Sequence, residues 1–228
     1  MKGWKCALLD LDGTIIDSKP GITKSVQYAL SFFGITEPNT QLLEAYIGPP
    51  LLESFTRCHQ LDPRQAAEAV DHFRRFYKQK GMMDHTLYPG ISSLLSMLAE
   101  SGMDVYLATS KATVFAEEII RYNELDVFFK GIYGSFLDGR RTEKAEVIRA
   151  VVHEHQLEHE STIMVGDRKH DVEGARNNGI ETIGVLYGYG SAQELKDAGA
   201  AYTVRSVEEL KQILQAGRLN ERRDNNSF

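Results

Sequence analysis

Two aspartates, Asp10 and Asp12, stand two positions apart directly after a short apolar run at residues 6–9. In an extended backbone, the side chains of residues i and i+2 point to the same side, so both carboxylates face one spot. They repel each other unless a shared proton or a cation relieves the repulsion, and Mg²⁺ suits this role because it takes oxygen ligands. Gly13 then lets the backbone turn closely around an anion. A plain strand-to-turn transition is the alternative, since Asp and Gly also favour turns.

A second pair of aspartates, Asp167 and Asp171, follows another apolar run at residues 162–165. If a helix begins here, two residues four positions apart lie on one face near its N-terminus. Acidic residues in a first turn also suit the helix dipole, so helix capping is the alternative. The positive end of a helix can offset the charge of one carboxylate more easily than the charge of a cluster. Four aspartates at neighbouring strand ends therefore need a cation.

Two hydroxyl residues and one lysine complete the set of candidate site residues. Thr109 and Ser110 follow the apolar run at residues 105–108. Hydroxyls and backbone amides at a helix N-terminus can hold a phosphate group, although an ordinary helix N-cap is the commoner use of these residues. Lys144 opens a helical pattern and could offset negative charge, but a lone lysine is more often a solvated surface charge.

The pattern of apolar residues predicts the elements that position these side chains. Apolar runs at residues 6–9, 105–108, 162–165 and 182–185 are typical of buried strands, and helical patterns lie between the later runs. Strands that alternate with helices favour a parallel sheet covered on both faces, an α/β fold. Ligands bind at the carboxyl ends of the strands in such sheets, so the candidate residues are expected to meet at one edge.

The first and second of these runs are separated by a segment without a strand signal. Its apolar residues recur at helical spacing, and Pro49 and Pro50 interrupt the pattern. We interpret residues 18–85 as a helical insert, residues 1–17 and 86–217 as the core, and residues 218–228, which are polar, as a flexible tail.

Composition excludes several other classes of protein. The net charge of −6 gives no basic face for a nucleic acid polymer. Met1 to Leu9 is too short for a signal peptide, and no apolar stretch is long enough to cross a membrane, so we expect a cytoplasmic protein. Cys6 and Cys58 are expected to be reduced thiols. Nothing in the sequence indicates an oligomeric state.

One further segment, residues 184–191, is rich in glycine. It lacks the lysine of a phosphate-binding loop, and we interpret it as the loop that leaves a strand.

Taken in order, the four candidate elements resemble the motifs of the haloacid dehalogenase-like hydrolases. The resemblance extends over nearly the whole chain, to about Leu214, and the segments that carry it are residues 10–18, residues 109–111, Lys144 and residues 166–171. It implies a Rossmann-like core with a small α-helical cap formed by the insert. Residues 47–51 and 166–171 are similar to the branch of phosphoglycolate phosphatase-like proteins and nucleotidases.

The resemblance also implies a role for each candidate residue. Asp10 would attack phosphorus and form an aspartyl-phosphate, while Asp12 would act as acid and then as base. The metal Mg²⁺ would be held by the Asp10 carboxylate, the Asp12 backbone carbonyl and Asp167, with support from Asp171. The groups that would bind the phosphoryl oxygens are Gly13, Thr109, Ser110 and Lys144.

Asp12 narrows the function within the family, because the dehalogenase members lack this second aspartate. We therefore expect a Mg²⁺-dependent phosphatase that acts on a small phosphorylated metabolite through an aspartyl-phosphate and is phosphoglycolate phosphatase-like. The alternatives are a 5'-nucleotidase or a phosphotyrosine-type phosphatase, and, more weakly supported, a sugar phosphomutase.

Overall fold

The computed structural model describes residues 3–224, and the side chains of residues 3–217. The chain divides into two compact units, which we call the core unit (residues 1–15 and 87 onward) and the helical unit (residues 16–86).

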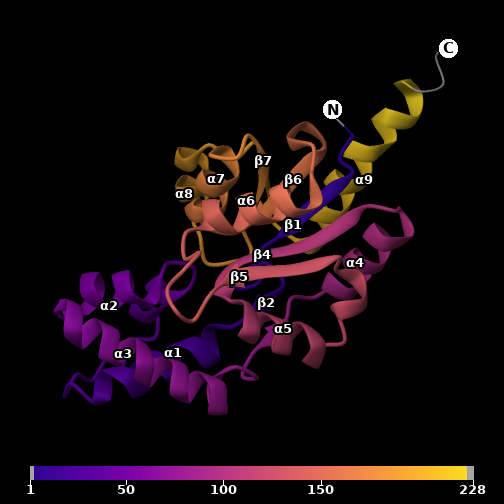
Figure 1. The fold of residues 1–228 in the computed structure, drawn as a ribbon. Helices are drawn as coiled ribbons and strands as arrows, with labels where there is room; N and C mark the ends of the chain where they lie inside the picture. Colours follow the sequence, from indigo (N-terminus) through magenta and orange to yellow (C-terminus); the bar gives the residue numbers. More distant parts are fainter. Residues whose placement is uncertain (1–2, 225–228) are drawn as a thin grey trace. The chain divides into compact units, whose positions relative to one another are not determined.

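The core unit is built on a parallel sheet of six strands with the spatial order β5-β4-β1-β6-β7-β8 (Figure 1). The strands are β1 (Cys6–Leu9), β4 (Asp104–Ala112), β5 (Gly131–Ser135), β6 (Thr162–Gly166), β7 (Glu181–Val185) and β8 (Tyr202–Val204). All four strands predicted from apolar runs are therefore confirmed. The sequence pattern missed β5, which contains two glycines, and β8, which has three residues and lies at the sheet edge.

Helices connect these strands, as the alternating pattern predicted. They are α4 (Ile91–Glu100), α5 (Thr113–Tyr122), α6 (Lys144–His155), α7 (Lys169–Arg176), α8 (Ala192–Ala198) and α9 (Val207–Asp224), with 3-10 turns η3 (Asp126–Phe128) and η4 (His159–Ser161). The α/β fold is thus confirmed. Of the segment predicted to be a flexible tail, residues 218–224 lie in α9, and residues 225–228 lie outside the described part of the chain.

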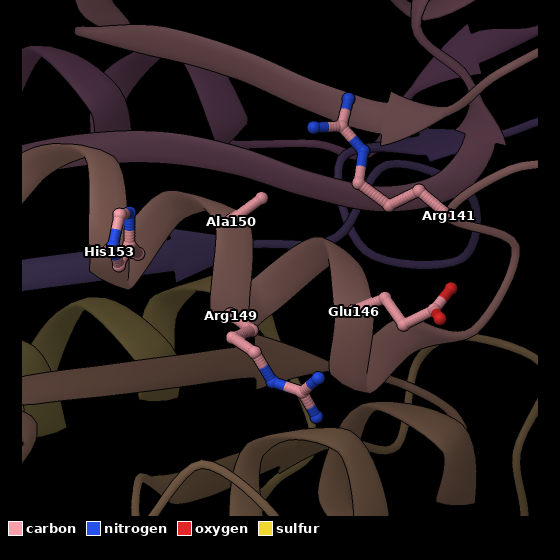
Figure 2. Close-up of a pocket in the computed structure, with 5 residues that line it drawn as sticks. All are labelled: Arg141, Glu146, Arg149, Ala150 and His153. Carbon is pink, nitrogen blue, oxygen red and sulfur yellow. The ribbon is translucent and has the colours of Figure 1, made fainter.

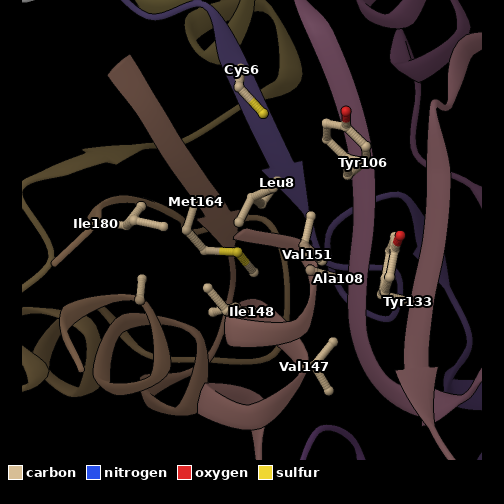
Figure 3. Close-up of a cluster of buried hydrophobic side chains, with 11 residues drawn as sticks. Cys6, Leu8, Tyr106, Ala108, Tyr133, Val147, Ile148, Val151, Met164 and Ile180 are labelled. Carbon is tan, nitrogen blue, oxygen red and sulfur yellow. The ribbon is translucent and has the colours of Figure 1, made fainter. Parts of the chain in front are cut away.

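A buried apolar cluster fixes how α6 lies on the sheet (Figure 3). Cys6 and Leu8 of β1 pack in this cluster with Val147, Ile148 and Val151 of α6. Because alternate strand residues share a face, the side of β1 that carries Cys6 and Leu8 is the side that α6 covers. The next residue of that parity is Asp10.

The helical unit contains α1 (Lys19–Ser31), η1 (Leu42–Tyr46), α2 (Leu51–His59), α3 (Pro63–Phe76) and η2 (Tyr77–Gly81). Helix α3 packs against both α1 and α2, and its start is capped by Asp62, whose carboxylate accepts hydrogen bonds from the amides of Arg64 and Gln65. The chain passes between the units at β2 (Ile16–Asp17) and β3 (Thr86–Leu87), which form a two-stranded sheet. Among the described residues, no helix combines the length and apolar character that a membrane span requires.

Candidate active site

Asp10 extends the parallel ladder by one residue beyond β1. Its amide donates a hydrogen bond to the carbonyl of Val165 in β6, at 2.9 Å. The alternation of side chains therefore continues, and Asp10 lies on the α6 side of the sheet. Lys144 is the first residue of α6, so the same packing that buries the apolar side chains brings a lysine to Asp10.

Three buried aspartates form a cluster at this edge of the sheet. Asp10, Asp167 and Asp171 each offer a carboxylate oxygen, and these atoms all lie within 4.8 Å of one another. The ammonium of Lys144 lies 2.7 Å from Oδ1 of Asp10 and 2.7 Å from Oδ1 of Asp171, and it also donates to the carbonyl of Ala108 at 2.8 Å. Lys144 is only 5% exposed, so it is a buried cation within the cluster and not a solvated surface charge.

Burial and mutual repulsion disfavour the charged carboxylates of this cluster. Burial raises the pKa of Asp167 well above its usual value, and the nearby charges of Asp171 and Asp10 raise it further. The pKa of Asp10 is also raised, by burial first and then by Asp171 and Asp12, against the opposing effect of Lys144. For Lys144, burial lowers the pKa, but the carboxylates of Asp10 and Asp171 outweigh it and raise the value to about 12. The effect of Lys144 therefore does not cancel the burial and repulsion that raise the pKa of Asp10.

Asp12 is held by a lysine that sequence reasoning left without a role. Its Oδ2 atom lies 3.0 Å from the ammonium of Lys111, and both side chains are at most 10% exposed. Lys111 stands two residues after Thr109 near the end of β4, where the register with β5 shifts between Ala108 and Ala112. The available signal was its place at the carboxyl end of a predicted strand, where we expected the candidate residues to meet.

The two hydroxyl residues lie at the end of a strand and do not cap a helix. Strand β4 continues to Ala112, and α5, which starts at Thr113, has no side-chain cap. The ordinary N-cap alternative is therefore wrong for Thr109 and Ser110. Thr109 is buried, and its Oγ1 accepts a hydrogen bond from the Lys111 amide at 3.2 Å. Ser110 is half-buried, and its carbonyl accepts a hydrogen bond at 2.9 Å from a serine of β5.

Gly13 lies directly against the metal-ligand candidate Asp167. Its φ of +79° belongs to the left-handed region, and an added Cβ would stand 2.2 Å from Oδ2 of Asp167. Both facts exclude a larger side chain here.

Asp171 contacts both the start of a helix and the charged cluster. Its Oδ2 accepts a hydrogen bond from the Arg168 amide at 3.0 Å, which satisfies a free donor just before α7. Its Oδ1 contacts Lys144. One carboxylate therefore stabilises the helix start and contributes to the charged cluster.

The donor set fits a hard divalent cation such as Mg²⁺. Oδ1 of Asp167 is fully buried and has no hydrogen-bond partner among the described residues, although a buried carboxylate oxygen without one is costly. The lysines Lys111 and Lys144 pair with three of the four aspartates, so the acidic groups outnumber these two basic ones. A divalent cation with oxygen ligands would satisfy the free oxygen and offset the excess charge.

A separate hollow of about 410 Å³ lies beside α6 in the core unit (Figure 2). It is lined by Arg141, Glu146, Arg149, Ala150 and His153. None of the predicted site residues lines it, and Figure 2 shows the guanidinium groups of its two arginines turned away from each other. The hollow therefore does not extend the acidic cluster.

Comparison with known proteins identifies the family of this chain. The family model described as haloacid dehalogenase-like hydrolase matches residues 7–185. A 5'-nucleotidase of Pseudomonas aeruginosa is 44% identical over 92% of this chain and 95% of its own length. The tyrosine-protein kinase PtkA of Mycobacterium tuberculosis is 34% identical over 91% of this chain and 71% of its own length. A phosphoglycolate phosphatase of Vibrio cholerae is 27% identical over 94% of this chain and 98% of its own length.

A solved structure shares the whole fold. It is a predicted phosphatase from Clostridium acetobutylicum, with a TM-score of 0.92 and 42% identity, covering 94% of this chain and all of that one. The parallel sheet covered by helices defines an α/β fold, and this solved structure of the same fold is described as a predicted phosphatase. The chain belongs to the haloacid dehalogenase-like hydrolase family, and within it to the phosphoric monoester hydrolases.

Proposed function

We propose that this protein is a Mg²⁺-dependent phosphatase that hydrolyses a small phosphate monoester through an aspartyl-phosphate on Asp10. The observation that carries the proposal is the buried cluster of Asp10, Asp167 and Asp171, in which the ammonium of Lys144 pairs with Asp10 and Asp171. Such a group places a carboxylate nucleophile beside a cation at the edge of the sheet where ligands bind. Residues 1–17 and 86–217 are the proposed phosphatase core, and residues 18–85 the proposed cap.

In the first step, a carboxylate oxygen of Asp10 attacks phosphorus, and the bond to the leaving oxygen breaks. Asp12 gives that oxygen a proton, so the alcohol leaves as a neutral molecule. In the second step, Asp12 takes a proton from water, whose oxygen attacks phosphorus. The bond to Asp10 then breaks, which releases phosphate and restores the carboxylate.

The remaining residues bind the transferring group. Lys144 offsets the charge of the phosphoryl oxygens, and Thr109, Ser110 and Gly13 contribute hydroxyl and amide donors. The groups that would hold Mg²⁺ are the carboxylates of Asp10, Asp167 and Asp171 and the backbone carbonyl of Asp12. When bound, this ion supplies further positive charge against the phosphoryl group.

For the substrate, we propose a nucleoside 5'-monophosphate ahead of phosphoglycolate. The support is the greater similarity to the relative named 5'-nucleotidase, at 44% identity, than to the one named phosphoglycolate phosphatase, at 27%. The cytoplasmic location stays a prediction.

The test of the reaction is an Asp10→Asn variant assayed with Mg²⁺ for phosphate release. A panel of phosphate esters would be used, with nucleoside monophosphates, phosphoglycolate, sugar phosphates and phosphotyrosine. Because an amide is a poor nucleophile, we expect kcat to fall at least about a thousandfold on every ester. Asp138→Asn, the same change at an exposed residue of the core unit, is the matched control and should keep wild-type kcat.

Full Mg²⁺-dependent activity in Asp10→Asn would contradict the proposal that Asp10 is the nucleophile. Isomerisation of a sugar phosphate faster than phosphate release would replace hydrolase with mutase. Release from phosphoglycolate but from no nucleotide would reverse the proposed order of substrates.

A further inference from the structure

The part of the glycine-rich segment that follows β7, residues 186–190, packs against Asp167. The amide of Tyr189 donates a hydrogen bond to Oδ2 of Asp167 at 2.7 Å. This bond occupies one of the two carboxylate oxygens. The other oxygen, Oδ1, is one of several buried polar atoms without a hydrogen-bond partner among the described residues.

The glycines of the segment leave room only for hydrogen atoms against Asp167. A Cβ added to Gly188 would stand 2.4 Å from Cβ of Asp167 and 2.4 Å from the carbonyl oxygen of Gly13. A Cβ added to Gly190 would stand 1.9 Å from the carbonyl oxygen of Asp167. Real Cβ contacts essentially never come under 3.0 Å, so the backbone of this segment approaches Asp167 as closely as only glycine permits.

Tyr187 anchors the same segment to the chain that follows Asp12. Its hydroxyl donates a hydrogen bond to the carbonyl of Thr14 at 3.1 Å, and its ring makes an edge contact with the ring of Tyr88 at 4.9 Å between centroids. The segment is therefore fixed at one side to the loop that carries Asp12 and Gly13, and at the other to Asp167.

We infer that residues 186–190 are positioning residues for the metal, because they hold Asp167 in one rotamer and direct its free Oδ1 toward the cation. This inference rests on the proposed Mg²⁺-dependent function. Groups that orient a metal ligand typically change metal affinity by about 10- to 100-fold when they are mutated. The segment would then be part of the cation site without supplying any ligand.

The test measures Mg²⁺ binding directly, by isothermal titration calorimetry on the full chain without substrate. Gly188→Ala pushes the segment away from Asp167, and we expect it to weaken Mg²⁺ binding about 10- to 100-fold. Tyr187→Phe removes one hydroxyl with little change in packing volume. We expect the Mg²⁺ affinity to fall about three- to tenfold, the change in affinity that corresponds to one hydrogen bond. Gly139→Ala is the control for a loss of stability alone. Its φ of +88° strains an alanine, but no atom lies within 4 Å of the added Cβ, so it should bind Mg²⁺ like the wild type.

Melting temperatures without metal separate a local effect from misfolding. Both test variants should unfold within a few degrees of Gly139→Ala in EDTA, while the rise in melting temperature on adding Mg²⁺ should shrink. If Gly188→Ala fails to fold, the Mg²⁺ affinity of Tyr187→Phe still tests the inference. Wild-type Mg²⁺ affinity in Tyr187→Phe and in any folded Gly188→Ala would overturn the inference and leave the proposed function intact. A wild-type protein that binds no Mg²⁺ would overturn the proposed function, and the inference with it.

Discussion

At the scale of single residues, the site depends on one buried cation. Lys144 contacts Asp10 and Asp171 with one ammonium group, and the backbone carbonyl of Ala108 accepts its third hydrogen bond. Removing one partner of a buried ion pair leaves an uncompensated charge, which costs far more than the loss of an exposed pair. Lys144 should therefore stabilise the fold as well as bind the phosphoryl group.

Replacing Lys144 should cost stability that Mg²⁺ partly restores. For Lys144→Met in EDTA at pH 7, we expect the free energy of unfolding to fall by about 3–5 kcal/mol, since Asp10 and Asp171 lose their counter-charge. Urea denaturation measures this change, and added Mg²⁺ should reduce it by supplying a cation.

Lys130→Met is the matched control for that variant. Lys130 pairs with Asp104 at 3.8 Å, and both side chains are more than half exposed. We expect a change of at most about 1 kcal/mol. Equal losses in the two lysine variants would show that the buried pair contributes no more than a surface pair.

At the scale of elements, a carboxylate from one helix stabilises the start of another. Glu194 of α8 accepts hydrogen bonds from the Lys169 amide at 2.9 Å and from Nε of Arg168 at 2.9 Å. These groups lie at the N-terminus of α7, where free amides and the helix dipole favour a negative charge. Arg168 and Lys169 lie between Asp167 and Asp171 in the chain. The contact of Glu194 with these two residues therefore helps to fix the position of the backbone that carries both aspartates.

This contact should make stability depend on pH. Burial alone would raise the pKa of Glu194, but hydrogen bonds from Lys169 and Arg168 outweigh it and lower the pKa below the usual 4.5. A carboxyl with a lowered pKa in the folded state stabilises the protein above pH 4.5 and loses that contribution as the pH falls through the folded value. We therefore expect Glu194→Gln to be less stable than wild type at pH 7, by about 1 kcal/mol after allowance for solvent exposure.

The difference in melting temperature between wild type and Glu194→Gln should shrink as the pH falls from 6 to about 3. Glu118→Gln, at an exposed position of α5 beyond the first turn of that helix, serves as control and should differ little from wild type at any pH. A difference for Glu194→Gln that stays constant over this range would exclude the electrostatic explanation.

At the scale of the whole molecule, the metal-ligand candidates and the single tryptophan all belong to the core unit. Trp4 is 1% exposed, and its ring meets that of Tyr202 edge-on, with 5.7 Å between centroids. Tryptophan fluorescence therefore reports on the unfolding of the unit that holds the cluster.

Binding of Mg²⁺ should raise the unfolding midpoint that Trp4 reports. A ligand that binds only the folded state adds about 2.7 kcal/mol of stability at 100 times its Kd. Thermal unfolding followed by tryptophan fluorescence, over a titration of Mg²⁺, checks this, and Asp167→Asn should abolish most of the rise. The same rise in wild type and Asp167→Asn would place the stabilising cation elsewhere.

Much of the fold was readable from the sequence, because four strands are continuous apolar runs that the sheet buries on both faces. The missed elements have weaker signals. Strand β5 contains two glycines, and β8 is a three-residue edge strand. In each case, contacts with neighbouring elements compensate for a local sequence that does not specify its own conformation.

By itself, the sequence determined the identity of the acidic and hydroxyl residues and the strand ends that carry them, because strand periodicity and chain order are local properties. Tertiary structure alone decided which charges meet. It buried Lys144 between Asp10 and Asp171, paired Lys111 with Asp12, and closed the glycine-rich segment around Asp167. These pairings join residues far apart in the chain, and they form only when the packing of α6 and the crossovers of the parallel sheet bring the strand ends to one edge.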